Sequence, residues 1–159
     1  MNVGIVIHTS SGHTLTFARA IEEMLKQKGH EVEILYLRTI GRVTPSGNSN
    51  FSIKNPPELD PFDTVLFGGP VWAFKASPVI MKFLTEEVQL LKNKKALSFV
   101  TMGLPFKFTG GDRALNMMND QLEASGADVV EGEKLLYILK SDKEKMVAAA
   151  QRVCDKLKA

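Results

Sequence analysis

The stretch "VGIVIHTSSGHTLTFARA", residues 3–20, decides the fold of this chain. Residues 3–8 are almost all apolar and rich in β-branched side chains, which is typical of a strand covered on both faces. From Leu15 onward apolar residues recur at helical spacing until Gly29, which can end a helix. A short loop of hydroxyl side chains separates the two. This order of strand, tight loop and helix predicts the first unit of a parallel sheet.

Apolar and amphipathic runs alternate along the rest of the chain. This alternation predicts an α/β fold: three layers, with a doubly wound parallel sheet, helices on both of its faces and right-handed crossovers. Further strands are predicted over residues 31–37, 63–69, 95–101 and 128–139, and further helices over residues 77–91, 112–125 and from 141 onward.

One connection interrupts the alternation. Residues 38–61, "RTIGRVTPSGNSNFSIKNPPELDP", have no helical period and are dense in Pro, Gly, Asn and Ser. A connection of this length is unusual in a compact domain, so it is either a functional loop or a crossover that has lost its helix. We expect a crossover without a helix.

Length and composition narrow the possible functions. The chain fits a single domain, residues 1–159. A net charge of +2 is too small to indicate a nucleic-acid partner, and no apolar run approaches the roughly 20 residues that cross a bilayer. The start, "MNVGIVIH", lacks the features of an export signal, so we expect a cytoplasmic protein. The only cysteine, Cys154, lies among apolar residues at helical spacing and is expected to be a buried structural thiol.

Three loops at the ends of predicted strands carry the residues that could form a site. They are "HTSSGHT" (8–14), "GGPVWAFKAS" (68–77) and "TMGLPFKFTGGD" (101–112). In an open parallel sheet, ligands bind outside the carboxyl ends of the strands. We therefore expect the three loops to converge.

The first loop has the features of a phosphate site made from the backbone. A helix that begins near Thr14 leaves its first N–H groups unpaired, and Gly12 lets the chain approach a ligand closely. The hydroxyls of Thr9, Ser10, Ser11 and Thr14 could donate to phosphate oxygens. Alternatively, these hydroxyls cap the helix. No GxxxxGK[ST] or GxGxxG loop is present, which argues against nucleoside triphosphate and dinucleotide sites of those types.

Aromatic side chains in the other two loops could form walls for a planar ring. Trp72, the only tryptophan, directly follows "GGPV" (68–71) at the end of a predicted strand, and Phe74 is close to it. An exposed aromatic side chain beside a phosphate site suits a planar ring with a phosphate tail, although Trp72 could instead pack into the core. The third loop offers a second apolar wall from Met102, Gly103, Leu104, Phe106 and Phe108.

Taken together, the three loops resemble those of the flavodoxins. "TSSGHT" (9–14) is similar to the (T/S)-x-(T/S)-G-x-T phosphate loop of that family. "GGPVWAFKASPVIMKFL" (68–84) is similar to the G-x-P-V-W segment after their third strand, and "FVTMG" (99–103) to their fourth strand and the loop beside the flavin. The resemblance covers essentially the whole chain. It implies a five-stranded parallel sheet in the order 2-1-3-4-5 and a tightly held, non-covalent FMN.

The resemblance also assigns residues to the site, although no catalytic side chain among them. The phosphate would be held by Thr9, Ser10, Ser11, Gly12, His13 and Thr14. One side of the flavin ring would be lined by Pro70, Val71, Trp72, Ala73 and Phe74, and the other by Thr101, Met102 and Gly103. A protonated His13 could neutralise phosphate charge, but we interpret it as a solvated loop residue. No metal site is expected, because His8 and His13 have no Cys, Asp or Glu between them.

Two departures from the flavodoxin pattern bear on redox behaviour. Flavodoxins commonly have a glycine and acidic residues in the second loop, where a peptide flip stabilises the one-electron-reduced flavin. Here Ala73 and Phe74 stand in that loop, and a side chain disfavours the positive φ that the flip usually requires. Flavodoxins are also strongly acidic, whereas this chain has a net charge of +2 and carries Lys75 and Lys107 in the presumed flavin loops. We expect a higher potential than a flavodoxin's and a two-electron preference.

Three functions are compatible with this sequence. The first is an FMN protein that transfers electrons to or from a redox partner protein. The second is an NAD(P)H-dependent two-electron reductase of quinone-like planar acceptors, with "GLPFKFTGG" (103–111) as the acceptor pocket. The third is a flavin-free binding or signalling module on the same sheet. Against the third, His8, Thr9, Gly68 and Gly69 stand where a phosphoacceptor site needs carboxylates.

Overall fold

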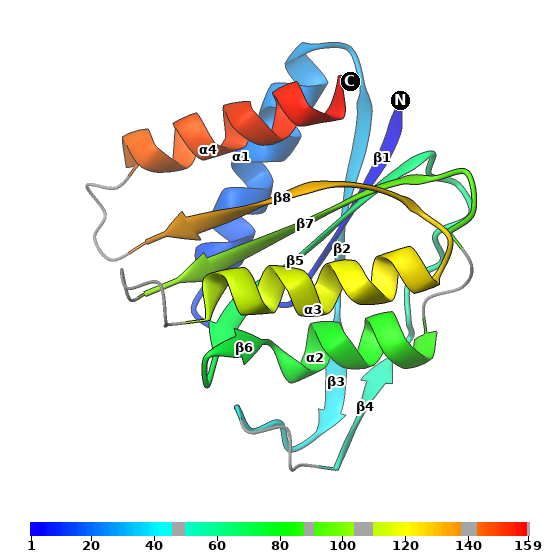
Figure 1. Cartoon of the computed structure of the whole chain (residues 1–159), viewed down its shortest axis with the longest axis vertical. Helices are drawn as coiled ribbons and strands as arrows, with labels where there is room; N and C mark the ends of the chain where they lie inside the picture. Colours follow the sequence, from blue (N-terminus) through cyan, green and yellow to red (C-terminus); the bar gives the residue numbers. More distant parts are fainter. Residues whose placement is uncertain (46–49, 88–90, 104–109, 138–142, 159) are drawn as a thin grey trace.

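The computed structural model describes residues 1–45, 50–87, 91–103, 110–137 and 143–158. A central sheet separates two layers of helices (Figure 1). Its parallel strands pair in the order β2-β1-β5-β7-β8, which is the predicted order 2-1-3-4-5. The predicted α/β fold is therefore confirmed. The strands are β1 (Asn2–Ile7), β2 (Glu31–Tyr36), β5 (Thr64–Trp72), β7 (Lys95–Met102) and β8 (Asp128–Leu136).

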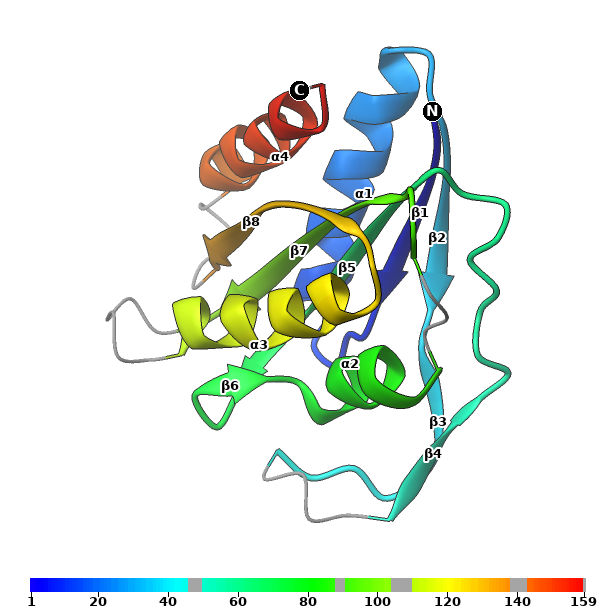
Figure 2. The same ribbon diagram turned by 45° about the vertical axis from the view of Figure 1, so that its right-hand side comes forward.

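Helices cover both faces of the sheet (Figures 1 and 2). One face carries α1 (His13–Gln27) and α4 (Lys143–Leu157). The other face carries α2 (Pro78–Lys82) and α3 (Gly111–Ala124). Among the described residues, no helix has both the length and the apolarity that a membrane crossing requires.

The face under α1 and α4 has its own apolar core. Ile5 and Ile7 of β1 pack with Phe17 of α1, and the rings of Phe17 and Phe99 meet edge to face at 5.2 Å. Cys154 of α4 belongs to this core, and burial raises the pKa of its thiol. The prediction of a buried structural thiol is confirmed.

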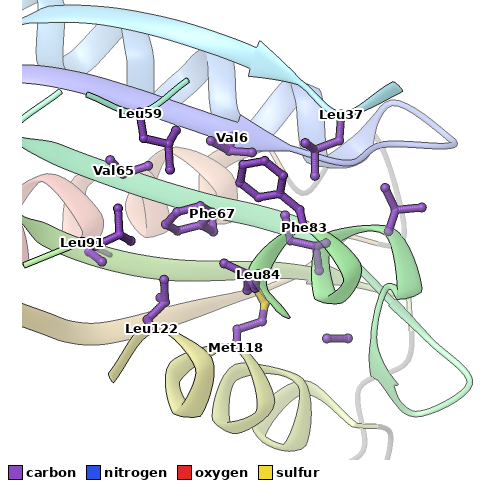
Figure 3. Packing of buried hydrophobic residues seen from close by; sticks show 14 of the residues in the cluster. Val6, Leu37, Leu59, Val65, Phe67, Phe83, Leu84, Leu91, Met118 and Leu122 are labelled. Carbon is purple, nitrogen blue, oxygen red and sulfur yellow. The ribbon is translucent and has the colours of Figure 1, made fainter. Parts of the chain in front are cut away.

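Figure 3 shows the second core, between the sheet and the layer of α2 and α3. It is dominated by aromatic and aliphatic side chains from strands and helices far apart in the sequence. Fully burying one such side chain contributes roughly 1.5–3 kcal/mol, so this core anchors the elements that carry the loops. Its members include Leu37, Leu59, Val65, Phe67, Phe83, Leu84, Met118 and Leu122.

The connection between β2 and β5 contains an antiparallel ribbon that the sequence analysis did not predict. It consists of β3 (Arg38–Gly41) and β4 (Phe51–Lys54), and it extends below α2 in Figures 1 and 2. Ile53 points into the second core, whereas Ile40 is 58% exposed. The described residues of 38–61 contain no helix, in agreement with the expected crossover without one.

The helix predicted over residues 77–91 is shorter than expected. α2 ends at Lys82, and Phe83–Glu87 form a π-helical turn, while residues 88–90 lie outside the described chain. The hydroxyl of Thr85 donates to the carbonyl of Met81 at 2.9 Å and so competes with backbone N–H groups for that carbonyl. The wider turn lets two consecutive residues, Phe83 and Leu84, both enter the core.

Candidate functional site

The three loops singled out in the sequence meet at the carboxyl edge of the sheet. The N–H of His8, in the first loop, donates to the carbonyl of Gly68 in the second at 3.0 Å. The hydroxyls of Thr14 and Thr101 join the first loop to the third through a hydrogen bond of 2.9 Å. Gly110 in the third loop packs directly against the backbone of Phe74 in the second. A Cβ added at Gly110 would lie only 2.3 Å from that backbone. The expected convergence is therefore present.

The first turn of α1 is open at its N-terminus. The N-cap is Gly12, with φ of 90°, and no described side chain caps the helix. The N–H of Thr16 is bonded to the carbonyl of Gly12 at 2.9 Å, so helix geometry leaves the N–H groups of residues 13–15 without a carbonyl partner in the helix. The alternative that loop hydroxyls cap α1 is therefore wrong.

The hydroxyl side chains of this loop have different surroundings. The Thr9 hydroxyl accepts the N–H of Gly12 at 3.2 Å and so stabilises the turn. Ser10 and Ser11 are exposed. Thr14 is only 1% exposed, and its bond to Thr101 ties α1 to the end of β7. No described atom lies within 4 Å of a Cβ placed on Gly12, so the space in front of this turn is open.

His13 is not a solvated loop residue, and that interpretation was wrong. It is the first residue of α1, it is half-buried, and its ring lies 4.5 Å from the ring of Tyr137. The N–H of Tyr137 donates to the carbonyl of Met102 at 2.9 Å. This bond places the end of β8 beside the start of the third loop. Tyr137 was not predicted as a site residue; the only signal for it in the sequence is an aromatic residue near the end of the last predicted strand.

The second loop is a tight hairpin. The end of β5 folds back onto β6 (Lys75–Ala76), with Trp72 opposite Lys75 in the register. The two turn residues, Ala73 and Phe74, both have positive φ, at 49° and 63°. This is the pattern of a type I′ turn, in which Asn and Gly are usual. The side chains at 73 and 74 were expected to disfavour positive φ, yet both residues adopt it.

The walls of the hairpin are partly accessible. Phe74 is 52% exposed at the tip, and Ala73 is exposed beside it. Trp72 is half-buried, as are Pro70 and Val71, so Trp72 is neither a core residue nor a free surface residue. Its ring meets the edge of the His8 ring at 5.1 Å and an angle of 86°.

His8 itself is a component of the site that the sequence analysis placed only at a strand end. Its Nδ1 is hydrogen-bonded to the hydroxyl oxygen of Ser77 at 2.5 Å, and that oxygen also accepts the N–H of Val79 at 3.2 Å. Burial lowers the pKa of His8 to about 4, so its imidazole is neutral at neutral pH. Ser77 is the N-cap of α2 and is fully buried.

The end of β7 forms the remaining side. Thr101 is buried, Met102 is half-buried and Gly103 is exposed, with no described atom within 4 Å of a Cβ placed there. The third loop continues into residues 104–109, so the predictions for Leu104, Phe106, Lys107 and Phe108 fall outside the described residues. Within the described chain, no cluster of three or more His, Cys, Asp or Glu side chains could hold a metal ion.

Several solved structures share this architecture over 98% or more of their own length. A flavodoxin from the domain Archaea is 18% identical, with a TM-score of 0.69 and full coverage of both chains. The chain has the flavodoxin fold. Oxidised Flavodoxin 2 from Bacillus cereus is 21% identical, with a TM-score of 0.70 over 98% of this chain and 99% of that one. Two-electron reduced Megasphaera elsdenii flavodoxin is 22% identical, with a TM-score of 0.62 over 94% and 98%. No protein-family model matches the sequence.

The flavodoxin fold explains why the site forms where it does. The chain runs from β1 to β2 on one side and then returns to β5 on the other side of β1. The crevice between the carboxyl ends of β1 and β5 is therefore the point at which the strand order reverses, which is where ligands bind in sheets of this type. Gly12 follows β1 and Trp72 ends β5, so both flank this crevice.

Proposed function

We propose that this chain binds FMN at the carboxyl edge of its sheet and transfers electrons through it. The observation that carries the proposal is an uncapped helix N-terminus, with open space in front of Gly12, at the same strand-order reversal as a half-buried tryptophan. A phosphate-tailed planar ring fits this combination. The bound flavin would supply the redox chemistry, while the protein binds and orients it.

The phosphate would be held by the first turn of α1. The N–H groups of residues 13–15 can donate to its oxygens, and the positive end of the helix dipole favours an anion there. The exposed hydroxyls of Ser10 and Ser11 can add donors, while Thr9 keeps the Gly12 turn in shape. This arrangement needs no lysine or arginine at the phosphate.

The ring would lie between the hairpin and the end of β7. Trp72 offers an aromatic surface on one side, and stacking contributes roughly 0.5–1.5 kcal/mol beyond the area buried. Met102 and Gly103 are accessible on the other side. Phe74, exposed at the hairpin tip, would cover the outer edge of the ring.

Titration of the unliganded protein with FMN tests the proposal. We expect binding of one FMN per chain, with quenching of both flavin and Trp72 fluorescence. Riboflavin, which lacks the phosphate, should bind at least about tenfold more weakly, a difference of about 1.4 kcal/mol. A protein that remains colourless and takes up no FMN would contradict the proposal and favour a flavin-free binding module.

Lys75 favours a second, more specific function: two-electron reduction of quinone-like acceptors by NAD(P)H. It stands opposite Trp72 in the hairpin and supplies a cation beside the ring site. Anaerobic addition of NADPH to the FMN-loaded protein tests this function, because a reductase bleaches the flavin without a partner protein and an electron carrier does not.

The predicted two-electron preference needs its own test. Positive φ at Ala73 and Phe74 does not separate one-electron from two-electron behaviour, so a redox titration of the FMN-loaded protein is needed.

A further inference from the structure

His8 links the two loops that would hold opposite ends of the ligand. It stands between β1 and the phosphate loop, and its N–H is bonded to the carbonyl of Gly68. His8 is 9% exposed, and its ring makes two contacts with the second loop (68–77): the bond to Ser77 and the edge contact with Trp72. The side chain that follows β1 therefore contacts both Trp72 at the end of β5 and Ser77 just after β6.

The hydrogen bond to Ser77 determines how the imidazole lies. The Ser77 hydroxyl is fixed by the N–H of Val79, so rotation of the His8 ring would break a buried hydrogen bond. An unsatisfied buried polar group costs about 1–3 kcal/mol. The ring that is held in this way presents its edge to the indole of Trp72 at 86°.

The histidine does not act through its charge. Burial lowers its pKa to about 4, so a neutral imidazole stands next to the phosphate loop at neutral pH. The side-chain contacts of His8 are with Ser77 and Trp72, at the two ends of the second loop. Its role is therefore geometric, namely the orientation of Trp72 relative to the loop that begins at Thr9.

We infer that His8 is a positioning residue that sets the orientation of Trp72 and thereby the affinity of the site for the flavin ring. The ring site belongs to the proposed function, on which this inference rests. The contacts of His8 with Ser77 and Trp72 are made by protein atoms alone, so they can be tested separately from ligand binding.

The test compares His8→Phe with the matched variant His30→Phe. His30 lies beyond the end of α1, where its Nδ1 meets the N-terminal amine at 3.1 Å, away from the three loops. We expect His8→Phe to shift the emission of Trp72, the only tryptophan, and to weaken FMN and riboflavin binding by the same factor, about tenfold. His30→Phe should change neither property. Equal weakening of both ligands identifies the ring and not the phosphate.

A double-mutant cycle with Ser77→Ala separates positioning from simple stabilisation. Loss of the α2 cap is common to both backgrounds and cancels in the cycle. We expect the double variant to bind FMN no more weakly than His8→Phe alone. A purely structural role would lower the free energy of unfolding but leave ligand affinity and Trp72 emission of the folded protein unchanged, and this result would overturn the inference. If His8→Phe does not fold, His8→Asn, which removes the ring, gives the same comparison.

The two proposals fail in different ways. If wild-type protein binds no FMN, the proposed function is wrong, and the emission of Trp72 in His8→Phe still decides whether His8 orients the indole. If wild-type protein binds FMN and His8→Phe binds it equally well with unchanged emission, the inference is wrong and the proposed function stands.

Discussion

Helices α1 and α2 begin at the same edge of the sheet, but their first turns are built in opposite ways. α1 begins after Gly12, in the left-handed conformation, without a side-chain cap. α2 begins after Ser77, a buried cap that is bonded to Val79 and to His8. A Ser cap stabilises a helix by about 1 kcal/mol relative to Ala. The start of α2 has this stabilisation, and the start of α1 lacks it. The uncapped terminus of α1 leaves its N–H groups free for a ligand. The capped terminus of α2 instead fixes the position of the hairpin that carries Trp72.

Replacement of Ser77 before α2 and of Ser11 before α1 should give the largest difference in the free energy of unfolding between these helix ends. Ser77→Ala removes the cap of α2 and leaves Nδ1 of His8 without its partner, so we expect a loss of about 2–4 kcal/mol in the free energy of unfolding. Ser11→Ala, in the exposed loop before α1, should change it by less than about 0.5 kcal/mol. Urea unfolding of both variants measures this. Similar losses would mean that α1 is capped as well.

Acid should weaken the anchored end through His8. Its pKa is about 4 in the folded protein and 6.5 in the unfolded chain, so the unfolded state binds more protons between these values. The contribution of His8 to the free energy of unfolding is therefore fully present above pH 6.5. It is lost as the pH falls toward 4, and the loss is about 3 kcal/mol in total. Urea unfolding at several pH values, in wild type and in His8→Phe, measures this contribution as the difference between the two proteins. The carboxylates titrate in both proteins, so their effect on the free energy of unfolding cancels in that difference. Identical pH dependence would contradict a buried neutral His8.

Two glycines with the same conformation sharpen the comparison at α1 itself. Gly12 and Gly29 flank the two ends of this helix, with φ of 90° and 89°, and neither has a described atom within 4 Å of an added Cβ. Alanine at either position should lower the free energy of unfolding by about 1–2 kcal/mol through positive φ. Only Gly12→Ala should weaken FMN binding, by about tenfold, because its methyl group enters the space that the phosphate needs. Equal FMN titrations for both variants would exclude the α1 terminus as the phosphate site.

The smallest effect should come from relief of strain in the hairpin that Ser77 anchors. Phe74 has φ of 63° and is half exposed, so Phe74→Gly should raise the free energy of unfolding by up to about 1 kcal/mol. Asn93→Gly, at φ of 68°, is the matched control and should gain less, because Asn tolerates this conformation. Thermal unfolding compares the two variants. A loss of stability in Phe74→Gly would show that its ring contributes more by packing than the turn costs.

Local patterns predicted most of the fold. Residues 3–8 and the apolar period from Leu15 identified β1 and α1, because a strand and an amphipathic helix have fixed spacings that neighbouring residues reveal. The same patterns missed the ribbon of β3 and β4, whose strands are too short to show a period. They also missed the π-helical turn after Lys82, where the hydroxyl of Thr85 donates to the carbonyl of Met81 and Phe83 packs in the core.

For the site, the sequence by itself determined the ingredients: a glycine that permits an uncapped helix start, hydroxyls around it, and one tryptophan after a buried strand. Only the tertiary structure decided which of them touch. Thr14 meets Thr101, His13 meets Tyr137, and His8 meets both Ser77 and Trp72, because the strand order brings together loops that are far apart in the chain. Contacts of this kind depend on the order and register of strands, which no local spacing encodes.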